Sequence, residues 1–419
     1  MEDQMILGEG VVYSTDCNIT RLNNNVLICG GSGSGKTTGI VEPRLLDTYN
    51  TSLIVTVTKR RIVNKYKDMF IKRGFIVRDA NFIDPEKSDI AFDPLEYVTS
   101  YTDIRFLAEA IVKANPQKDK SNVDPYWDQA ATSLLSAEIA YTMMTNEDAT
   151  FADVLSLHDK LIFTESNGRL ETSLDIEFNY LNNIKPNCFA VQCWRSFQQL
   201  PIKTASCVFS TLNTTIDTIF NPKLRKMIAK KEKIDFEEIA TKKTVLFIST
   251  SAVNPALFSF INMFYAQMFK QLFEFAENQP TGYLPVPVHV ICDDFATGGR
   301  ILNFPEYISI FREKRISVTL LLQSESQLEN MYSIEDTTTI INNCDTYIYM
   351  GGMDLTTARH ISERLNAPLE DVLYMPIGQE IIFRRGQKPI ITKRYNIYQN
   401  EKYKNITKEF EKTIYMKDL

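Results

Sequence analysis

Short apolar runs recur along this sequence, and amphipathic segments separate them. The runs are Val26–Cys29, Leu53–Val57, Phe75–Val77, Val245–Ile248, Val288–Cys292, Val318–Leu322, Tyr347–Met350 and Ile381–Phe383. Continuous apolar runs that alternate with helical segments are typical of parallel strands buried on both faces. The pattern therefore predicts an α/β fold with a mostly parallel central sheet flanked by helices.

The stretch from residue 99 to residue 241 lacks such runs and shows helical periodicity instead. Its predicted helices are Asp103–Ala114, Asp128–Thr145, Leu174–Ile184, Thr204–Phe220 and Leu224–Ala229. We therefore expect an all-α domain at 99–241, inserted into an α/β domain made of 1–98 and 242–398. Mixed Lys and Glu residues in 399–419 predict a solvated helical tail.

The segment from Val245 to Phe269 carries no charged residue, so a membrane span has to be considered. It contains several polar side chains, among them Ser249 and Asn262, which would have no hydrogen-bond partners inside a bilayer. We predict instead a buried strand, a turn at Asn254 and a mostly buried helix.

The composition narrows the class of protein. Of the 419 residues, 44% are hydrophobic and 23% are charged, as in soluble globular enzymes. The formal net charge of -6 excludes a bulk polycation, so any nucleic-acid contact has to come from local basic patches. The 7 cysteines are scattered without zinc spacing, which indicates reduced thiols in a cytosolic protein. Met1–Gly10 carries acids and no apolar core, so it does not predict a signal peptide.

A glycine-rich loop follows the first predicted strand. Its residues are Gly30, Gly31, Ser32, Gly33, Ser34, Gly35, Lys36, Thr37 and Thr38, which fit GxxxxGK[ST] and its next position. The loop opens a predicted helix at Thr37–Leu46, so it has the strand–loop–helix context of a phosphate-binding loop, which a chance Gly/Ser linker would lack. We predict that it binds ATP, that Lys36 neutralises the β- and γ-phosphates and that the Thr37 hydroxyl binds Mg²⁺.

Two acids end another predicted strand, Val288–Cys292. Asp293 and Asp294 are therefore expected at the carboxyl edge of the sheet, where ligands bind in such folds. Successive side chains point to opposite sides of a strand, so we assign Asp293 to the metal and Asp294 to polarising the attacking water. The alternative is a strand-end turn with two solvated acids.

Two further residues have candidate roles in phosphoryl transfer. Gln323 ends the strand Val318–Leu322 and is placed to sense the γ-phosphate or to orient water. Arg312 lies on the preceding predicted helix and is a candidate for stabilising transition-state charge on a neighbouring subunit. The alternative for Arg312 is a solvated helix residue beside Lys314 and Arg315.

Together these motifs resemble the type IV secretion coupling ATPases, the TraG/TraD-type conjugative DNA-transfer proteins, in a version similar to those of Gram-positive mobile elements. The residues that carry the resemblance are Gly30–Thr37, Asp124–Trp127 (DPYW), Asp293–Ala296 (DDFA), Gln323–Leu328 (QSESQL) and Asn343–Asp345 (NCD). Their order and spacing match from about residue 20 to about residue 395.

The resemblance implies a RecA-like nucleotide-binding domain at 1–98 and 242–398 and a substrate-docking all-α domain at 99–241. It implies a homo-hexamer with ATP and Mg²⁺ between subunits at the cytoplasmic face of the cell membrane. Its partners would be a relaxase, relaxosome accessory proteins, single-stranded DNA and the secretion channel. The membrane helices common in the family are absent from this chain, so we expect the anchor to lie elsewhere and the isolated chain to be a monomer.

The family pattern also assigns residue roles. It makes Lys36, Asp294, Arg312 and Gln323 catalytic, with Arg312 acting in trans, and makes Thr37 and Asp293 the metal ligands. Two departures predict a slow or specialised enzyme. Asp294 stands where the family usually has Glu, and the second strand is followed by Lys59 without the usual Asp-Pro-Lys-Gly-Glu.

Other interpretations remain open from the sequence. Basic residues group at Lys59–Arg73, at Lys223–Lys233 and between Arg384 and Arg394, and each group is either a DNA contact or a solvated surface. His158, His289 and His360 have no Cys, Asp or Glu at useful spacing, so they are expected to be structural or surface residues. The competing functions are a DNA translocase of the FtsK/HerA type, a secretion assembly ATPase and a nucleotide-gated receptor with little hydrolysis.

Overall fold

The computed structural model describes residues 2–114, 125–166, 169–229, 232–251, 253–293, 295 and 300–417. Within these residues the central sheet has 9 strands. In spatial order they are β13 (Ile390–Lys393), β12 (Gln379–Arg384), β11 (Thr346–Tyr349), β3 (Val26–Cys29), β10 (Ile316–Leu322), β9 (Val288–Cys292), β4 (Ser52–Val57), β8 (Thr244–Ser249) and β5 (Ile76–Asn81). The strands from β11 to β5 are parallel, and β12 and β13 are antiparallel additions. The predicted α/β fold with a mostly parallel sheet is confirmed.

Both faces of the sheet are buried, as the continuous apolar runs predict. Along β3, Leu27 and Cys29 face one core while Val26 and Ile28 face the other. The first core contains α12 (Pro255–Glu277), α13 (Phe304–Lys314), α14 (Glu325–Met331), α15 (Ile334–Asn342), α16 (Leu355–Leu365) and α17 (Leu369–Leu373). The second contains α2 (Glu42–Leu46), α3 (Arg60–Lys72) and one side of α18 (Glu401–Lys417). No helix in the described part of the chain has both the length and the apolar character needed to cross a bilayer.

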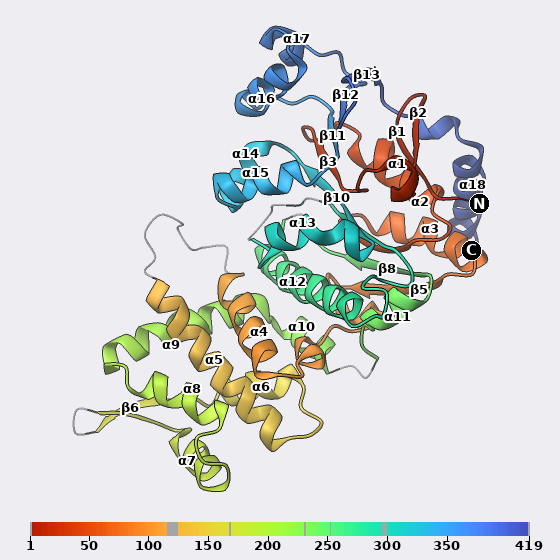
Figure 1. Ribbon diagram of the computed structural model, residues 1–419. Coiled ribbons are helices and arrows are strands. Elements are labelled where there is room, and N and C mark those ends of the chain that lie inside the picture. Colours follow the sequence, from red (N-terminus) through yellow and green to blue (C-terminus); the bar gives the residue numbers. More distant parts are fainter. Residues whose placement is uncertain are drawn as a thin grey trace.

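A helical region lies beside the sheet, between β5 and β8 in sequence (Figure 1). Its helices are α4 (Tyr101–Lys113), α5 (Pro125–Thr145), α6 (Phe151–His158), α7 (Asp175–Ile184), α8 (Phe189–Gln198), α9 (Ile202–Ile219), α10 (Pro222–Ile228) and α11 (Phe236–Thr241). The expectation that this region is wholly α-helical was wrong, because β6 (Phe163–Ser166) and β7 (Arg169–Thr172) form an antiparallel hairpin. Strands of four residues are too short to give a periodic signal.

Helix α12 joins the helical region to the sheet. Phe260 on α12 makes edge-to-face contacts with Phe82 and Phe92. Both lie in the segment that connects β5 to α4. The Lys270 ammonium of the same helix lies 2.5 Å from the Asp103 carboxylate on α4. The hydrophobic core is therefore continuous from the sheet into the helical region. The segment checked as a membrane span forms β8 and most of α12, as predicted.

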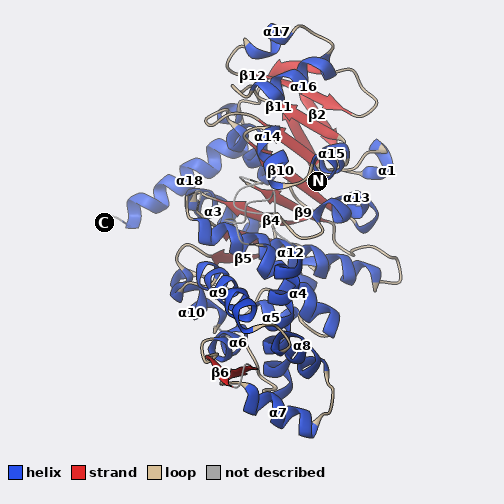
Figure 2. Cartoon of the chain, turned by 90° about the vertical axis from the view of Figure 1, so that its left-hand side faces the viewer, coloured by secondary structure: helices blue, strands red, loops and turns tan. Residues whose placement is uncertain are grey.

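The ends of the chain differ from the expectation. The predicted tail helix exists as α18, but it is not fully solvated, because Tyr403 is buried and the Lys65 ammonium on α3 lies 3.3 Å from the centre of its ring. Ion pairs from Lys72 to Glu409 and from Lys402 to Asp47 hold the same helix. It lies beside α3 (Figure 2). The N-terminal hairpin β1 (Gln4–Gly8) and β2 (Val11–Ser14) was not predicted.

The core of the helical region contains a buried charged pair. His158 at the end of α6 and Glu138 on α5 have no exposed side-chain surface, and His158 Nδ1 lies 3.0 Å from the Glu138 carboxylate. His158 is therefore a buried structural residue, as expected. Its acidic partner could not be read from the sequence spacing, because helix packing brings together residues far apart in sequence. Burial opposes the charged imidazole, but the neighbouring Glu138 outweighs it and raises the pKa of His158 above 6.5.

We predict that this pair makes stability depend on pH. A raised folded-state pKa gives stability that is present below about pH 6.5 and is lost as pH rises through the folded-state pKa. The free energy of unfolding, measured by urea titration of the buried Trp194 fluorescence, should fall between pH 6 and pH 9. His158→Gln should make that fall smaller, and an unchanged pH slope in this variant would contradict the assignment.

Candidate nucleotide-binding site

The glycine-rich loop leaves β3 between two neighbouring strands and is anchored to both. Gly30 N–H donates to the Leu322 carbonyl at the end of β10, at 3.1 Å. Gly31 N–H donates to the Gly351 carbonyl after β11, at 2.9 Å. Gly33 and Gly35 have φ values of 73° and 84°, which a side chain at either position would strain. The sheet therefore fixes where the loop begins, and the glycines let it turn back on itself.

The interior of the loop has the chemistry of an anion site. The Lys36 ammonium donates to the Gly30 and Gly31 carbonyls at 2.5 and 3.2 Å, so its charge points into the turn. The Ser34 hydroxyl is buried and has no hydrogen-bond partner among the described residues. An orphan hydroxyl and an ammonium on carbonyl oxygens are groups that a phosphate can satisfy better. The loop therefore fits the phosphates that the sequence predicts.

The helix predicted at Thr37–Leu46 begins with a π-helical turn, Thr37–Val41, before α2. Glu42 N–H donates to the Thr37 carbonyl, five residues back. Pro43 has no N–H to donate, and the wider turn comes directly before it. The turn places Thr37 and Thr38 at the mouth of the loop, where both are half-buried.

Asp293 lies at the same edge of the sheet as the loop. It follows β9, which is separated from β3 only by β10, so the two strands are about 10 Å apart at a spacing of roughly 4.8 Å per strand. Thr58, after β4, donates to the Asp293 carboxylate at 3.4 Å. No group of three or more His, Cys, Asp or Glu side chains suited to a metal occurs in the described part. An Mg²⁺ ion bound by Thr37, Asp293 and phosphate oxygens would not need such a group. The water-polarising role assigned to Asp294 falls outside the described residues.

Gln323 follows β10, the strand between the loop and Asp293, and its side chain is exposed. Its backbone N–H donates to the Gln327 side chain at 3.1 Å. Two residues later, the buried Glu325 carboxylate binds His360 at 2.6 Å and Arg364 at 3.3 Å on α16. His360 therefore has an acidic partner that the spacing in sequence did not show. These contacts hold the Gln323 segment against α16, beside the loop.

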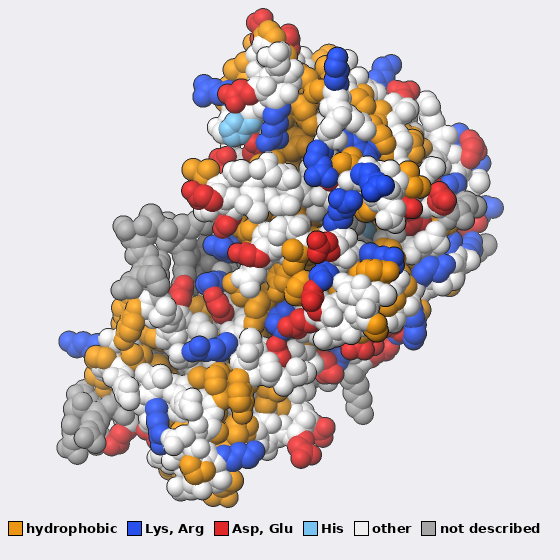
Figure 3. All heavy atoms as spheres, viewed as in Figure 1, with side chains coloured by type: hydrophobic (Ala, Val, Ile, Leu, Met, Phe, Trp, Pro, Cys, Tyr) orange, Lys and Arg blue, Asp and Glu red, His pale blue; other side chains and the backbone are white. Residues whose placement is uncertain are grey.

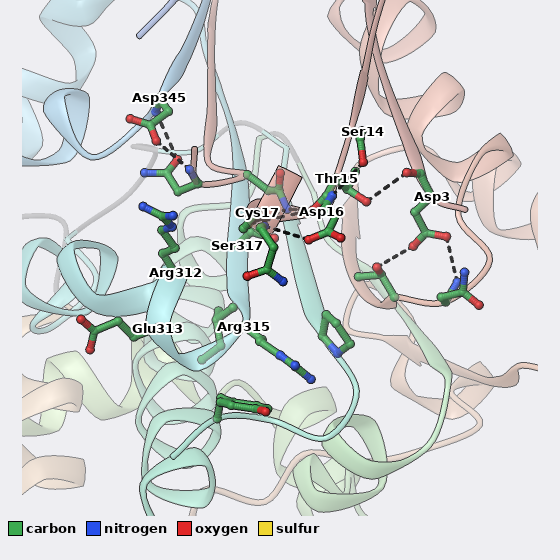
Figure 4. A pocket seen from close by; sticks show the side chains of 18 of the residues that line it. Asp3, Ser14, Thr15, Asp16, Cys17, Arg312, Glu313, Arg315, Ser317 and Asp345 are labelled. Carbon is green, nitrogen blue, oxygen red and sulfur yellow. Dashed lines mark hydrogen bonds between the residues drawn. The ribbon is translucent and has the colours of Figure 1, made fainter. Parts of the chain in front are cut away.

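Arg312 lies at the opposite edge of the sheet. It is exposed near the end of α13, and β10 begins at Ile316 just after it. The 7 residues of β10 span roughly 23 Å, so Arg312 cannot reach the loop of its own chain. It borders a cleft of about 1030 Å³ and points toward the side where Asp345 lies (Figure 4). Any action of Arg312 on a nucleotide would therefore require a second chain.

About half of the described residues in the basic groups considered for DNA contact form ion pairs within the chain. The ion pairs are Arg60–Asp79, Lys65–Glu42, Lys67–Asp89, Lys72–Glu409, Arg225–Asp159, Lys226–Glu86, Lys233–Asp93 and Arg385–Asp345. Lys230 and Lys231 lie outside the described residues. On the face in Figure 3, basic and acidic side chains are interspersed. The paired residues hold elements together, which favours the structural interpretation for them over a DNA contact.

One basic residue of the group between Arg384 and Arg394 lies at the predicted nucleotide site. Arg394, just after β13, is next to the glycine-rich loop, and a Cβ atom on Gly35 would lie 3.7 Å from its Nη1. The sequence left Arg394 between a DNA contact and a solvated surface. No motif indicates that β12 and β13 bring the chain back to this edge of the sheet.

Comparisons with known proteins agree with this geometry. The family model described as "Type IV secretory system Conjugative DNA transfer" matches residues 2–367. The bacterial conjugative coupling protein TrwBdeltaN70, in complex with sulphate, has a similar structure with a TM-score of 0.63 and 13% identity, covering 88% of this chain and 85% of that one. TrwB in complex with ADP and Mg²⁺ gives 0.60 and 12%, with the same coverage of 88% and 85%. VirB4 of Thermoanaerobacter pseudethanolicus gives 0.55 and 12%, covering 94% and 96%. No curated protein sequence matches.

At these identities the structural matches establish the fold, which this chain shares with TrwB and VirB4. This confirms the predicted fold class over nearly the whole chain.

We predict that the two glycines at the start of the loop respond differently to alanine. A Cβ atom on Gly30 would lie 2.7 Å from the Ser34 hydroxyl and 2.9 Å from Met350 Cβ, whereas one on Gly31 meets nothing closer than 3.8 Å. Overpacking of this kind costs about 1–3 kcal/mol, which corresponds to a factor of about 5 to 150 in affinity. Gly30→Ala should weaken ATP binding in calorimetric titrations by that factor, while Gly31→Ala should bind like wild type. Equal affinities in the two variants would contradict the assigned packing.

Proposed function

The chain belongs to the type IV secretory system conjugative DNA transfer family, and we propose that it is the ATP-driven coupling protein of a conjugation system. In this role it recruits a relaxase bound to DNA and delivers both to the secretion channel. The observation that carries the proposal is the shared sheet edge of Lys36, Gln323 and Asp293, with Arg312 at the opposite edge.

The nucleotide is proposed to be ATP with Mg²⁺. TrwB, which shares the fold, is known in complex with the ATP analogue ADPNP and with ADP and Mg²⁺. In this chain Gly30–Thr38 would hold the phosphates, and Thr37 and Asp293 would hold the metal, which supplies charge neutralisation during phosphoryl transfer. Lys36 would stabilise the β- and γ-phosphates, Asp294 would polarise water and Gln323 would orient it. Asp294 is one methylene shorter than Glu, so we expect slow turnover.

The position of Arg312 supports catalysis across a subunit interface. Its guanidinium is about the length of β10 away from the loop of its own chain. A ring would bring the Arg312 edge of one chain to the loop edge of the next, and repeated heterologous contacts close into rings. We propose a homo-hexamer as the active form and a monomer for the isolated chain.

The partners are proposed from the family and from the architecture. The described helices between 99 and 241 pack on one another, which suits docking of relaxase and relaxosome proteins. Single-stranded DNA would pass through the ring to channel components at the cytoplasmic face of the membrane. Because many of the basic residues are ion-paired within the chain, no single large basic patch would line the central channel of the ring. A smaller patch, repeated in every subunit, would give the channel its positive charge.

We predict that two inactive variants restore activity when mixed. Lys36→Ala should lower DNA-stimulated ATP hydrolysis roughly hundred-fold, and Arg312→Ala should do the same. In an equal mixture, about one quarter of the interfaces combine an intact loop with an intact neighbouring Arg312, so about a quarter of wild-type activity should return.

The matched control is Arg385→Ala, which alters another arginine of the same cleft and should stay active. The absence of recovery on mixing would exclude action in trans. Full ATP binding with no DNA-stimulated turnover in wild type would favour the nucleotide-gated receptor instead.

A further inference from the structure

Arg394 contacts the glycine-rich loop from the far end of the sheet. Its Nη2 donates to the Met350 carbonyl at 2.7 Å, and its backbone N–H donates to the Gly378 carbonyl at 2.9 Å. A Cβ atom on Gly35 would lie 3.7 Å from Nη1 and 3.8 Å from Cδ of this arginine. The bond to Gly378 fixes the backbone of Arg394, and the bond to Met350 holds its side chain near the loop. The two segments lie more than about three hundred residues apart in sequence and meet because the chain returns to one sheet edge.

The charge of Arg394 is not neutralised within the chain. It forms no ion pair with any carboxylate of the described residues, and its buried Nε has no hydrogen-bond partner there. A guanidinium has five N–H donors, and the structure uses only one of its groups, Nη2, on a neutral carbonyl. A half-buried cation with unused donors beside an anion-binding loop is therefore placed to take a further oxygen ligand.

The acid next to Arg394 does not satisfy it. Glu380 on β12 is fully buried, and neither carboxylate oxygen has a hydrogen-bond partner among the described residues. Gly8 on β1 covers it, since a Cβ atom there would meet the carboxylate at 2.5 Å. Burial raises the pKa of Glu380 to about 8, against the opposing effect of Arg394. At neutral pH the carboxyl is therefore mostly protonated, and it leaves the charge of Arg394 available.

The position along the loop indicates which part of a nucleotide Arg394 would meet. In loops of this type Lys36 reaches the β- and γ-phosphates, while the backbone near the start of the helix cradles the α- and β-phosphates. Arg394 lies beside Gly35, whose would-be Cβ is also 3.7 Å from the Thr38 hydroxyl, at the helix end of the loop. Lys36 instead points to Gly30 and Gly31, at the strand end.

We infer that Arg394 is a nucleotide-binding residue that contacts the α-phosphate end of the ligand from within the same chain. The inference deepens the proposed function and rests on it, since it presumes that the loop binds a nucleoside polyphosphate. It also gives the two antiparallel strands a role, because β12 and β13 carry this cation back to the edge where the loop lies.

Equilibrium binding of ADP and of ADPNP to the full chain tests the inference. Arg394→Gln should weaken both ligands by the same factor, about ten- to hundred-fold, as expected for loss of a charged hydrogen bond. The factor should be equal because both ligands carry the α-phosphate. Lys393→Gln removes the neighbouring exposed cation and is the matched control, which should bind like wild type.

The thermal unfolding temperature separates ligand contact from support of the fold. Without nucleotide, Arg394→Gln should unfold at the wild-type temperature, and only the increase produced by ADP should shrink. If Arg394→Gln is unstable without ligand, Arg394→Lys decides, because it retains the charge. A stable Lys variant with affinity between wild type and Gln supports the inference, and one that binds as poorly as Gln overturns it.

Two results would refute different claims. If Lys36→Ala abolishes ADP binding while Arg394→Gln binds both ligands like wild type, Arg394 is only a structural clamp on Met350 and the inference fails. If the wild-type chain binds neither ADP nor ADPNP, the proposed nucleotide site itself is wrong.

Discussion

The strands from β11 to β5 all run in one direction, so their carboxyl ends share one edge of the sheet. A triphosphate needs several cations and metal ligands within a few ångströms, and this edge is where loops after β3, β10 and β9 can supply them. Because α13 enters β10 from the other edge, the same arrangement keeps Arg312 about one strand length away. Strand direction therefore decides which groups can serve the chain's own nucleotide and which only a neighbour's.

The position of the glycine-rich loop depends on the same sheet. Its first two N–H groups bond to carbonyls at the end of β10 and just after β11, so the loop is held by strands that also carry Gln323 and the Met350–Gly351 segment. A substitution at any of these strand ends would therefore shift the loop that holds the phosphates. The contact of Arg394 with the Met350 carbonyl extends this dependence to the last strands of the sheet. Helix α12 links the sheet to the helical region, because its aromatic side chains lie in one hydrophobic core with residues of the sheet and of the helical region.

Much of the fold could be predicted because parallel strands buried on both faces have a strong local signal. The runs at Val26–Cys29 and Val288–Cys292 match β3 and β9 residue for residue. The short hairpin β6–β7 and the exposed strand β13 were missed because four residues, or alternation with polar side chains, give little periodicity. Residues whose roles depend on long-range packing were missed for another reason. His158 and Glu138, Lys65 and Tyr403, and Arg394 and Gly35 meet only after folding, and nothing in their local sequence indicates the partner.

The central claim is that the loop and Asp293 act on one metal–nucleotide complex. The most direct test is titration of Mn²⁺ into the chain saturated with ADPNP, followed by electron paramagnetic resonance. Thr37→Val and Asp293→Asn should each weaken Mn²⁺ binding about ten-fold or more, whereas Glu313→Gln, an acid in the cleft at the opposite edge, should leave it unchanged. Equal Mn²⁺ affinity in all of these variants and in wild type would mean that the β9 edge takes no part in the site.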